Sequence, residues 1–149
     1  MAKGSAARLN YGPLSALVGF QLRRAFLRSN QLFGRLVGDV GLAPGHFGVL
    51  TLISLNPGSL QREIADAAGL DRSSLTQMLD QLSKLKYVER RPGPDRRSFN
   101  LFVTAAGAAA CASAQAKVQK HEKLIRGSLS REEVSVLLTL LKRLADGAD

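Results

Sequence analysis

The clearest chemical potential in this sequence lies in a run of polar and basic side chains near the middle of the chain. Hydroxyl and amide groups occur close together at Ser73, Ser74, Thr76 and Gln77. Such groups both donate and accept hydrogen bonds, as the edges of nucleic-acid bases require, and a glutamine can bond an adenine through two atoms. Six Lys and Arg residues then follow within residues 84–97, against two acids. These cations could neutralise phosphates.

Residues that could do covalent or metal chemistry are few and scattered. The chain has one cysteine, Cys111, and two histidines, His46 and His121, and no Cys, His, Asp or Glu grouping has metal-ligand spacing. No glycine-rich phosphate loop is present. We therefore expect no catalytic residue, no metal, no cofactor and no enzymatic activity. Cys111 lies among alanines, which favours a small buried side chain over a redox switch.

The composition indicates a single basic globular domain. The chain has 149 residues, of which 45% are hydrophobic and 22% charged, and its formal net charge is +9. Such a charge favours a polyanionic partner. One cysteine and no recognisable export signal predict a cytoplasmic protein. The longest stretch without charge, residues 40–61, contains two prolines and four glycines, so we expect no membrane span.

The periodicity of apolar residues predicts the elements that position these side chains. A long helix should begin at Pro13 and end near Gly38, and a second should begin at Pro44. Gly69 should end a short helix, and Asp71 should cap the next. Further elements are a hairpin of residues 87–91 and 99–103, a helix from Thr104 to about Arg126, and a last helix with a Ser130/Glu133 capping box.

A short helix, a glycine turn, a polar-faced helix and a basic hairpin together predict a winged helix-turn-helix. Ala65 should lie where the two helices cross, and Leu75 and Met78 should close the core. The helix of residues 71–86 would enter the major groove of DNA, and Arg96 or Arg97 at the hairpin tip would reach a minor groove. The alternative is a solvated helix face followed by an ordinary surface hairpin.

The last helix carries more apolar side chains than one chain can easily cover. We infer that it forms a dimer interface with parts of the first and fifth helices. A terminal helix enclosed within one chain is the alternative. The expected interface residues are Leu14, Leu17, Leu124, Val134, Leu137, Leu138 and Leu141.

Four runs of the chain, at residues 60–65, 70–76, 82–90 and 95–98, resemble the core of MarR-type transcriptional regulators. The resemblance covers residues 13–147, and the Asp-x-Arg of the wing is its most specific part. It implies a triangular homodimer that binds a palindromic operator, usually as a repressor, with Arg97 in the minor groove and Asp95 orienting the wing. The chain departs from the pattern at Ala43, where many members have a capping Ser or Thr. The expected DNA contacts are Gln61, Arg62, Arg72, Ser73, Ser74, Thr76, Gln77, Lys84, Asp95, Arg96 and Arg97.

The same resemblance implies release from DNA by a small anion, often an aromatic acid or its derivative. Residues 1–39 hold six basic residues and one acid, with Arg23, Arg24 and Arg28 close together. These arginines could hold an anionic effector. Several arginines carry more positive charge than one carboxylate needs, so a phosphorylated ligand such as an aromatic acyl-CoA is a candidate. Its apolar part would contact Phe20, Leu27, His46 and Phe47. The alternative is a solvated face that attracts DNA at long range.

The sequence therefore predicts a mainly α protein, a winged helix-turn-helix with long N- and C-terminal dimerisation helices and one β-hairpin wing. A flexible arm (1–12), a helical dimerisation region (13–39 and 104–149) and a DNA-binding domain (40–103) are expected. The predicted function is a homodimeric, ligand-responsive regulator of transcription, with double-stranded DNA and a second copy as partners. A DNA-binding protein indifferent to sequence is the alternative.

Overall fold

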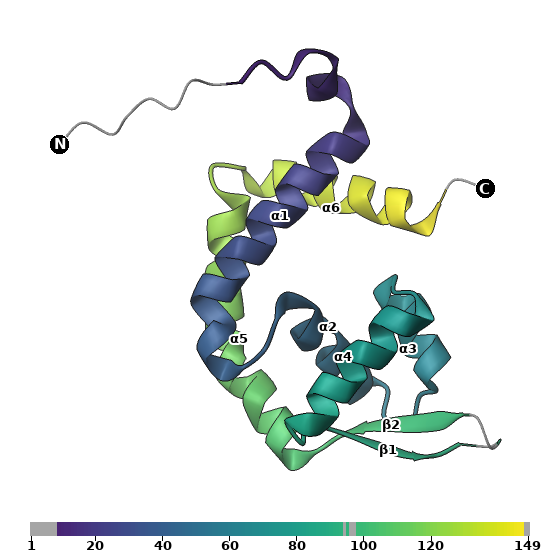
Figure 1. The fold of residues 1–149 in the computed structure, drawn as a ribbon. Coiled ribbons are helices and arrows are strands. Elements are labelled where there is room, and N and C mark those ends of the chain that lie inside the picture. The colour runs from purple at the N-terminus through teal and green to yellow at the C-terminus, as the bar shows by residue number, and fades with distance from the viewer. Residues whose placement is uncertain (1–8, 94, 96–97, 148–149) are drawn as a thin grey trace.

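The computed structural model describes residues 9–93, 95 and 98–147 and is mainly helical (Figure 1). Most of the arm predicted for residues 1–12, together with Arg96 and Arg97, lies outside these residues. In order along the chain, the elements are η1 (Gly12–Ala16), α1 (Val18–Val37), η2 (Gly38–Val40), α2 (Pro44–Leu55), α3 (Gln61–Ala68), α4 (Arg72–Lys84), β1 (Val88–Pro92), β2 (Phe99–Val103), α5 (Ala105–Arg126) and α6 (Arg131–Asp146).

The start of the first helix differs from the prediction. A continuous helix from Pro13 is wrong, because a 3-10 turn, η1, comes first and extended backbone at Leu17 separates it from α1. The Ser15 hydroxyl donates to the Gly12 carbonyl (2.8 Å), and the Gln21 amide donates to the Ser15 carbonyl (2.8 Å). These side chains satisfy backbone groups locally, which competes with continued helix.

The helix-turn-helix forms as its sequence predicts. Gly69 ends α3 with a positive φ of 63°, which glycine adopts without strain. Asp71 caps α4 by accepting a hydrogen bond from the Ser74 backbone (2.8 Å). Residues 58–59, just before α3, bond to strand β2 of the wing. The Gly58 N–H donates to the Leu101 carbonyl (2.8 Å), and the Leu101 N–H donates to the Ser59 carbonyl (3.0 Å). The two-stranded hairpin is therefore fixed at its base.

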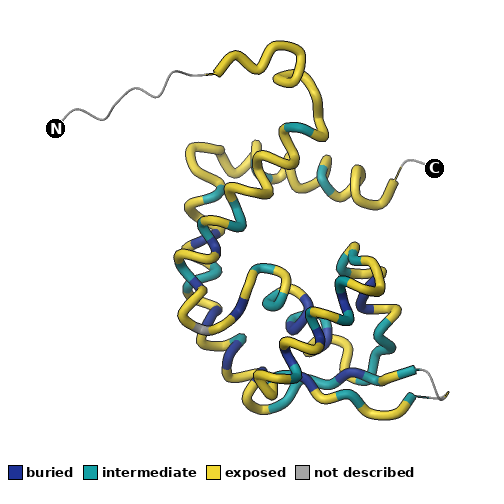
Figure 2. The backbone as a smooth tube through the Cα atoms, viewed as in Figure 1, coloured by how far each residue is buried: buried dark blue, intermediate teal, exposed yellow. Residues whose placement is uncertain are grey.

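One hydrophobic core lies inside the helix-turn-helix and its junction with α1 and α5. Ala65 on α3 is buried in this core, and Met78 packs against it, next to Gly45. Both residues were predicted to belong to the core. Figure 2 shows the buried positions gathered in this lower part of the molecule. The largest fully buried side chains are Val37, Leu42, Val49, Leu50, Ile53, Leu75, Leu79, Leu82 and Leu101.

Helix α5 runs alongside α1 and joins this core to α6 (Figure 1). Thr104 caps α5 by accepting from the Gly107 N–H (3.0 Å), and the small residues Ala110 and Ala114 are buried against its neighbours. His121 is also buried, with its Nε2 3.1 Å from the carbonyl of Ser29. The small side chains of these alanines allow α5 to pack closely against α1.

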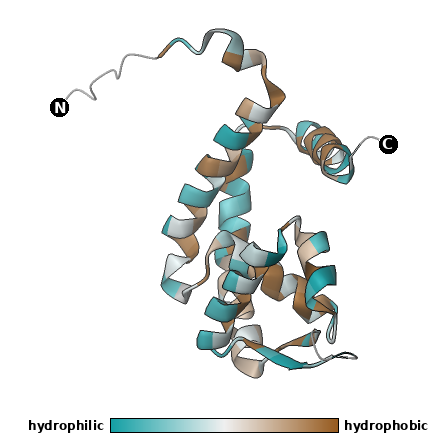
Figure 3. Ribbon diagram, turned by 45° about the vertical axis from the view of Figure 1, so that its right-hand side comes forward, coloured by the Kyte–Doolittle hydropathy of each residue, from teal (hydrophilic) through white to brown (hydrophobic). Residues whose placement is uncertain are grey.

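Helix α6 begins with the predicted Ser130/Glu133 capping box but covers little of the chain. None of its residues is buried; Figure 2 shows the helix almost wholly as exposed, and Figure 3 shows that it carries hydrophobic residues. Leu138 is 50% exposed and Leu144 58%. A terminal helix enclosed within one chain is therefore excluded. None of the helices in the described part of the chain is both long and apolar enough to cross a membrane.

Candidate nucleic-acid interface

Helix α4 separates its two faces cleanly. Leu75, Leu79 and Leu82 point into the core and are fully buried, whereas Gln77 and Lys84 on the opposite side are exposed. Apolar residues at helical spacing cause this orientation, because burying them turns the intervening positions outward. The exposed face is thus free to meet a groove of DNA along its length.

The N-terminus of α4 is held by its cap. The carboxylate of Asp71 accepts from the backbone N–H of Ser74 (2.8 Å) and from the Ser74 hydroxyl (2.6 Å). These hydrogen bonds, that of the hydroxyl foremost, lower the pKa of Asp71 below its ordinary value of 3.8. The hydroxyl proton of Ser74 is therefore directed to Asp71, while Arg72 and Ser73 remain exposed.

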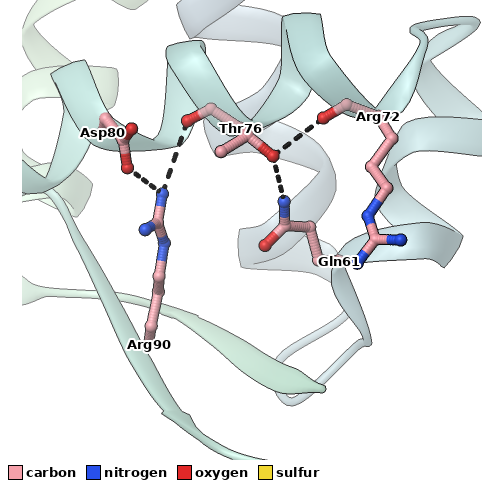
Figure 4. A network of polar contacts seen from close by, with 5 residues as sticks. All are labelled: Gln61, Arg72, Thr76, Asp80 and Arg90. Carbon is pink, nitrogen blue, oxygen red and sulfur yellow. Dashed lines mark hydrogen bonds and ion pairs between the residues drawn. The ribbon is translucent and has the colours of Figure 1, made fainter. Parts of the chain in front are cut away.

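Two other predicted DNA contacts bond to each other (Figure 4). The Thr76 hydroxyl donates to the Arg72 carbonyl (2.8 Å) and accepts from Nε2 of Gln61 (2.8 Å). Its only proton is thus used inside helix α4, and the Gln61 amide joins α3 to α4. These side chains position the helix in the free protein. A direct contact of either with DNA stays a prediction.

The two glutamines of α4, Gln77 and Gln81, differ in their surroundings. Oε1 of Gln81 lies 2.8 Å from Nε2 of His46. The other ring nitrogen of His46 accepts from the Ala43 N–H (3.3 Å), so Nε2 carries the proton and donates to Gln81. Gln77, in contrast, makes no side-chain hydrogen bond within the described residues. Both groups of its amide are therefore without a partner among the described side chains and backbone.

His46 also supplies a capping contact at the start of α2, where Ala43 stands in place of the Ser or Thr of many MarR-type regulators. Ala43 has no capping side chain, and α2 nevertheless begins at Pro44 as predicted. The His46 ring accepts from the backbone N–H of Ala43 and thereby supplies half of a capping box. A residue expected to line an effector pocket thus bridges the start of α2 and helix α4.

The arginines of the wing strand point in opposite directions. Nη2 of Arg90 lies 2.7 Å from Oδ1 of Asp80 on α4. Arg91 pairs with Glu89 (3.1 Å) and lies over the ring of Phe102, 4.2 Å from its centre. The hydrogen bond from Arg91 lowers the pKa of Glu89. Neither strand arginine is therefore an unpaired cation.

The tip of the wing is described only in part. Asp95 is exposed, and its carbonyl accepts from the Ser98 N–H (3.2 Å). Arg96 and Arg97, the predicted minor-groove residues, lie outside the described residues. Outside the wing, Arg62, Arg72 and Lys84 are exposed and form no ion pair with another described residue.

The predicted effector residues fall into two groups. Arg24 lies over the rings of Tyr11 (4.6 Å to the centre) and Phe20 (5.9 Å) near the start of α1. Phe47 instead packs against Phe33, with ring centres 6.4 Å apart. Since Phe20 and Phe33 are thirteen residues apart on α1, roughly 20 Å separates the groups along the helix. Within one chain they do not form a single pocket.

A pocket that the sequence analysis missed lies between α1 and α5. Its volume is about 240 Å³, and two arginines, Arg28 and Arg35, line it. Seven residues separate them, which places both on one face of α1. That spacing is visible in the sequence, and it could have led us to include Arg35 with Arg28 among the predicted effector residues. The remaining lining residues are Gln31, Leu32 and Leu124. Arg23 and Leu27, also predicted, are exposed on α1.

The predicted dimer residues form an uncovered apolar surface at the other end of the molecule. Five of them are more than 40% exposed, namely Leu14, Leu17, Leu124, Leu137 and Leu138. Val134 and Leu141 are half-buried. The described residues contain no group of three His, Cys, Asp or Glu side chains that could hold a metal ion.

Comparisons with known proteins match this arrangement. The family model described as MarR family matches residues 40–98. The chain is 34% identical over 145 residues to the putative transcriptional regulatory protein for the hcr operon of Thauera aromatica, covering 96% of this chain and 87% of that protein. Among solved structures, the transcriptional repressor CouR bound to a 23-mer DNA duplex superimposes with a TM-score of 0.83 and 38% identity, covering 93% of this chain and 99% of that one. CouR bound to p-coumaroyl-CoA gives a TM-score of 0.83 and 36% identity, with coverages of 92% and 97%. The similarity extends well beyond the helix-turn-helix.

Proposed function

The chain belongs to the MarR family of transcriptional regulators, and we propose that it acts as a homodimeric repressor that a small anionic effector releases from a pseudo-palindromic operator. It is a regulator and not an enzyme, since its relatives are regulators. One observation carries the proposal. The exposed face of α4 presents an unbonded amide at Gln77, with an arginine-rich hairpin directly beside the helix.

In the proposed complex, α4 lies in the major groove. Gln77 reads a base, and Arg62, Arg72, Ser73 and Lys84 contact phosphates or base edges around it. Arg96 or Arg97 at the wing tip enters the adjacent minor groove, with Asp95 orienting the tip. The structure of CouR on a DNA duplex supports this reading.

A second copy is proposed to cover the apolar surface of α6 and of the segment from η1 to Leu17, just before α1. The surface contains Leu17, Leu137 and Leu138, each more than 40% exposed, and large apolar patches of this kind mark contact sites. A two-fold axis through it sets two α4 helices on successive turns of DNA, about 34 Å apart. The helical region of residues 13–39 and 104–149 is then the dimerisation region, and residues 40–103 form the DNA-binding domain.

The effector is proposed to be an aromatic acid or its CoA thioester. The structure of CouR with p-coumaroyl-CoA supports the thioester. Arg23, Arg24 and Arg28 supply the charge that several phosphates need, and Phe20 lies beside Arg24. Because His46 and Phe47 lie in the separate group, roughly 20 Å away along α1, they would contact the aromatic part only of the longer ligand, the CoA thioester. His46 bonds to Gln81, so a ligand there changes a contact of the DNA-reading helix.

Selection of binding sites from random DNA by the purified chain tests the DNA proposal. A palindromic consensus is expected, and Gln77→Ala should lose discrimination of about 1–3 kcal/mol at one base pair of each half-site. Lys84→Ala should weaken binding to all sequences alike and lower the salt slope by about one. Binding at moderate salt that yields no consensus sequence would instead support the alternative function, a DNA-binding protein that is indifferent to sequence.

A release assay tests the effector proposal. Aromatic acids and their CoA thioesters are added to the complex with the selected operator, and Arg23→Ala and Arg28→Ala should raise the concentration required for release. Lys120→Ala is the matched control, since Lys120 is an exposed cation on α5 outside the proposed site. An unchanged concentration in both arginine variants contradicts the site.

A further inference from the structure

The side chain of Arg90 connects the wing to the helix that reads DNA (Figure 4). Arg90 belongs to β1, and its Nη2 lies 2.7 Å from Oδ1 of Asp80 and 3.5 Å from the carbonyl oxygen of Thr76. Both acceptors are on α4, one turn apart. A single guanidinium therefore contacts two successive turns of the recognition helix.

Helix α4 is also held at this turn by a contact from α3 (Figure 4). The amide of Gln61 on α3 donates to the Thr76 hydroxyl, while Arg90 approaches the Thr76 carbonyl. Thr76 is thus the point at which α3, α4 and β1 meet through polar groups (Figure 4). Displacing Arg90 removes its contacts with α4 but leaves in place the hydrogen bond from Gln61 to Thr76 and the backbone hydrogen bonds of Leu101 to residues 58–59.

We propose that Arg90 is a positioning residue that fixes the wing relative to α4, so that the wing tip meets the minor groove when Gln77 lies in the major groove. The inference rests on the proposed function. Arg90 lies opposite Leu101 in the hairpin, and Leu101 is fully buried, so Arg90 shares the inward face of the sheet. Farther along the wing, the Pro92 and Phe99 pair is exposed. Arg90 therefore lies between the buried base and the exposed outer half.

The pair is poorly suited to a purely stabilising role. The side chains of Arg90 and Asp80 are 26% and 51% exposed, and exposed pairs add little to folding stability. Nε of Arg90 is buried without a hydrogen-bond partner among the described residues, which opposes folding. An apolar side chain of similar size would avoid that cost. What it could not supply is a directional contact between β1 and α4.

The charge of Asp80 offers a second, electrostatic explanation for any loss of DNA binding when Arg90 is removed. An experiment must distinguish this explanation from positioning. A carboxylate on a DNA-facing helix repels phosphates, and pairing with Arg90 neutralises it. Removing Arg90 would therefore weaken DNA binding through either cause. Positioning predicts that Asp80→Ala, which removes both the repulsion and the acceptor for Arg90, also displaces the wing.

The first test is footprinting on the selected operator. Arg90→Gln and Asp80→Ala should each lose hydroxyl-radical protection of the minor groove at the wing and keep methylation protection of the major groove. The salt slope should fall by about one for each wing arginine that leaves the DNA. A variant that is only partly folded binds less DNA but keeps the wild-type footprint and slope. Arg91→Gln is the matched control and should keep both, because Arg91 is paired within the wing.

The double variant Asp80→Ala/Arg90→Gln decides between the two causes. If it regains the wing footprint that Arg90→Gln lost, neutralisation of Asp80 explains the effect and the positioning role is overturned. Continued loss of the footprint supports positioning.

A measurement on the free protein separates this inference from the proposed function. Nitroxide labels at Ser73→Cys and Phe99→Cys, in a Cys111→Ser background diluted with unlabelled chain, report the distance from α4 to the wing. A narrow distribution is expected with Arg90 and a broad one with Arg90→Gln. Equal distributions overturn the inference even if an operator is found, and the broadening supports it even if none is.

Discussion

Gly107 on α5 lies against the backbone of Tyr87 just before the wing. A Cβ added at Gly107 would come 2.3 Å from the Tyr87 carbonyl oxygen, which already accepts from the Thr104 N–H (3.0 Å). The Thr104 hydroxyl also donates to the Lys86 carbonyl (2.6 Å). The first turn of α5 and the start of β1 are thus in direct backbone contact.

Gly107→Ala should destabilise the protein through this contact. The obstructing atoms belong to the backbone and move little, so we expect a loss of about 1–3 kcal/mol in the free energy of unfolding. Urea denaturation measures it. Gly48→Ala is the control, because Gly48 lies within α2 with no atom within 4 Å of the added carbon. That change should raise stability by about 0.5–1 kcal/mol. Equal effects of the two substitutions would contradict the close contact.

The cap at Asp71 should make stability depend on acid. Hydrogen bonds from Ser74 lower the pKa of Asp71 in the folded state, so its contribution is complete above the ordinary value of 3.8 and is lost as pH falls through the lower folded pKa. Asp71→Asn keeps a capping oxygen and removes this titration. Melting temperatures measured between pH 2 and 6 should therefore fall less steeply in acid for the Asn variant than for the wild type. Parallel curves would show that Asp71 contributes nothing to the acid dependence.

Leu138→Glu should separate the proposed dimer. Leu138 is 50% exposed on α6 and far from the core of the helix-turn-helix, so the charge should leave the fold intact. We expect the dissociation constant of the dimer to rise by roughly a hundredfold, which corresponds to the loss of one large apolar contact. Light scattering after size exclusion measures it. Thr139→Glu places the same charge on the next residue, where the helix faces elsewhere, and should remain dimeric.

Cys111 should react slowly in the folded protein. Burial raises the pKa of its thiol, so less thiolate is present at neutral pH. Iodoacetamide at pH 8 should alkylate the folded chain more slowly than a short cysteine peptide, and unfolding in guanidinium should remove the difference. Rapid modification of the folded chain would reopen a redox role for this residue.

The elements that local chemistry determines were predictable from the sequence. Gly69, Asp71, Thr104 and the Ser130/Glu133 box mark helix ends where the structure has them, because capping acts over three or four residues. The polar face of α4 also followed from the spacing of its leucines. Apolar periodicity did not reveal the break at Leu17, since Ser15 and Gln21 interrupt the helix through polar contacts.

The partners of the site residues were not predictable, because they come from distant parts of the chain. Gln61 and Thr76 are fifteen residues apart, and His46 and Gln81 thirty-five, and nothing in the spacing of either pair indicates a contact. Each pairing depends on how α2, α3 and α4 pack. The predicted effector residues are arginines and apolar side chains, but Arg24 and Phe20 lie near the start of α1, whereas Phe47 on α2 packs near the end of α1.

The outward apolar face of α6 has a consequence for how the amount of this protein governs its action. The core of the helix-turn-helix closes within one chain, whereas the proposed pairing needs a second copy. By mass action, the paired form at low abundance grows with the square of the number of chains. Doubling synthesis would then nearly quadruple the supply of the form that occupies both halves of an operator, which gives a gene under its control a threshold.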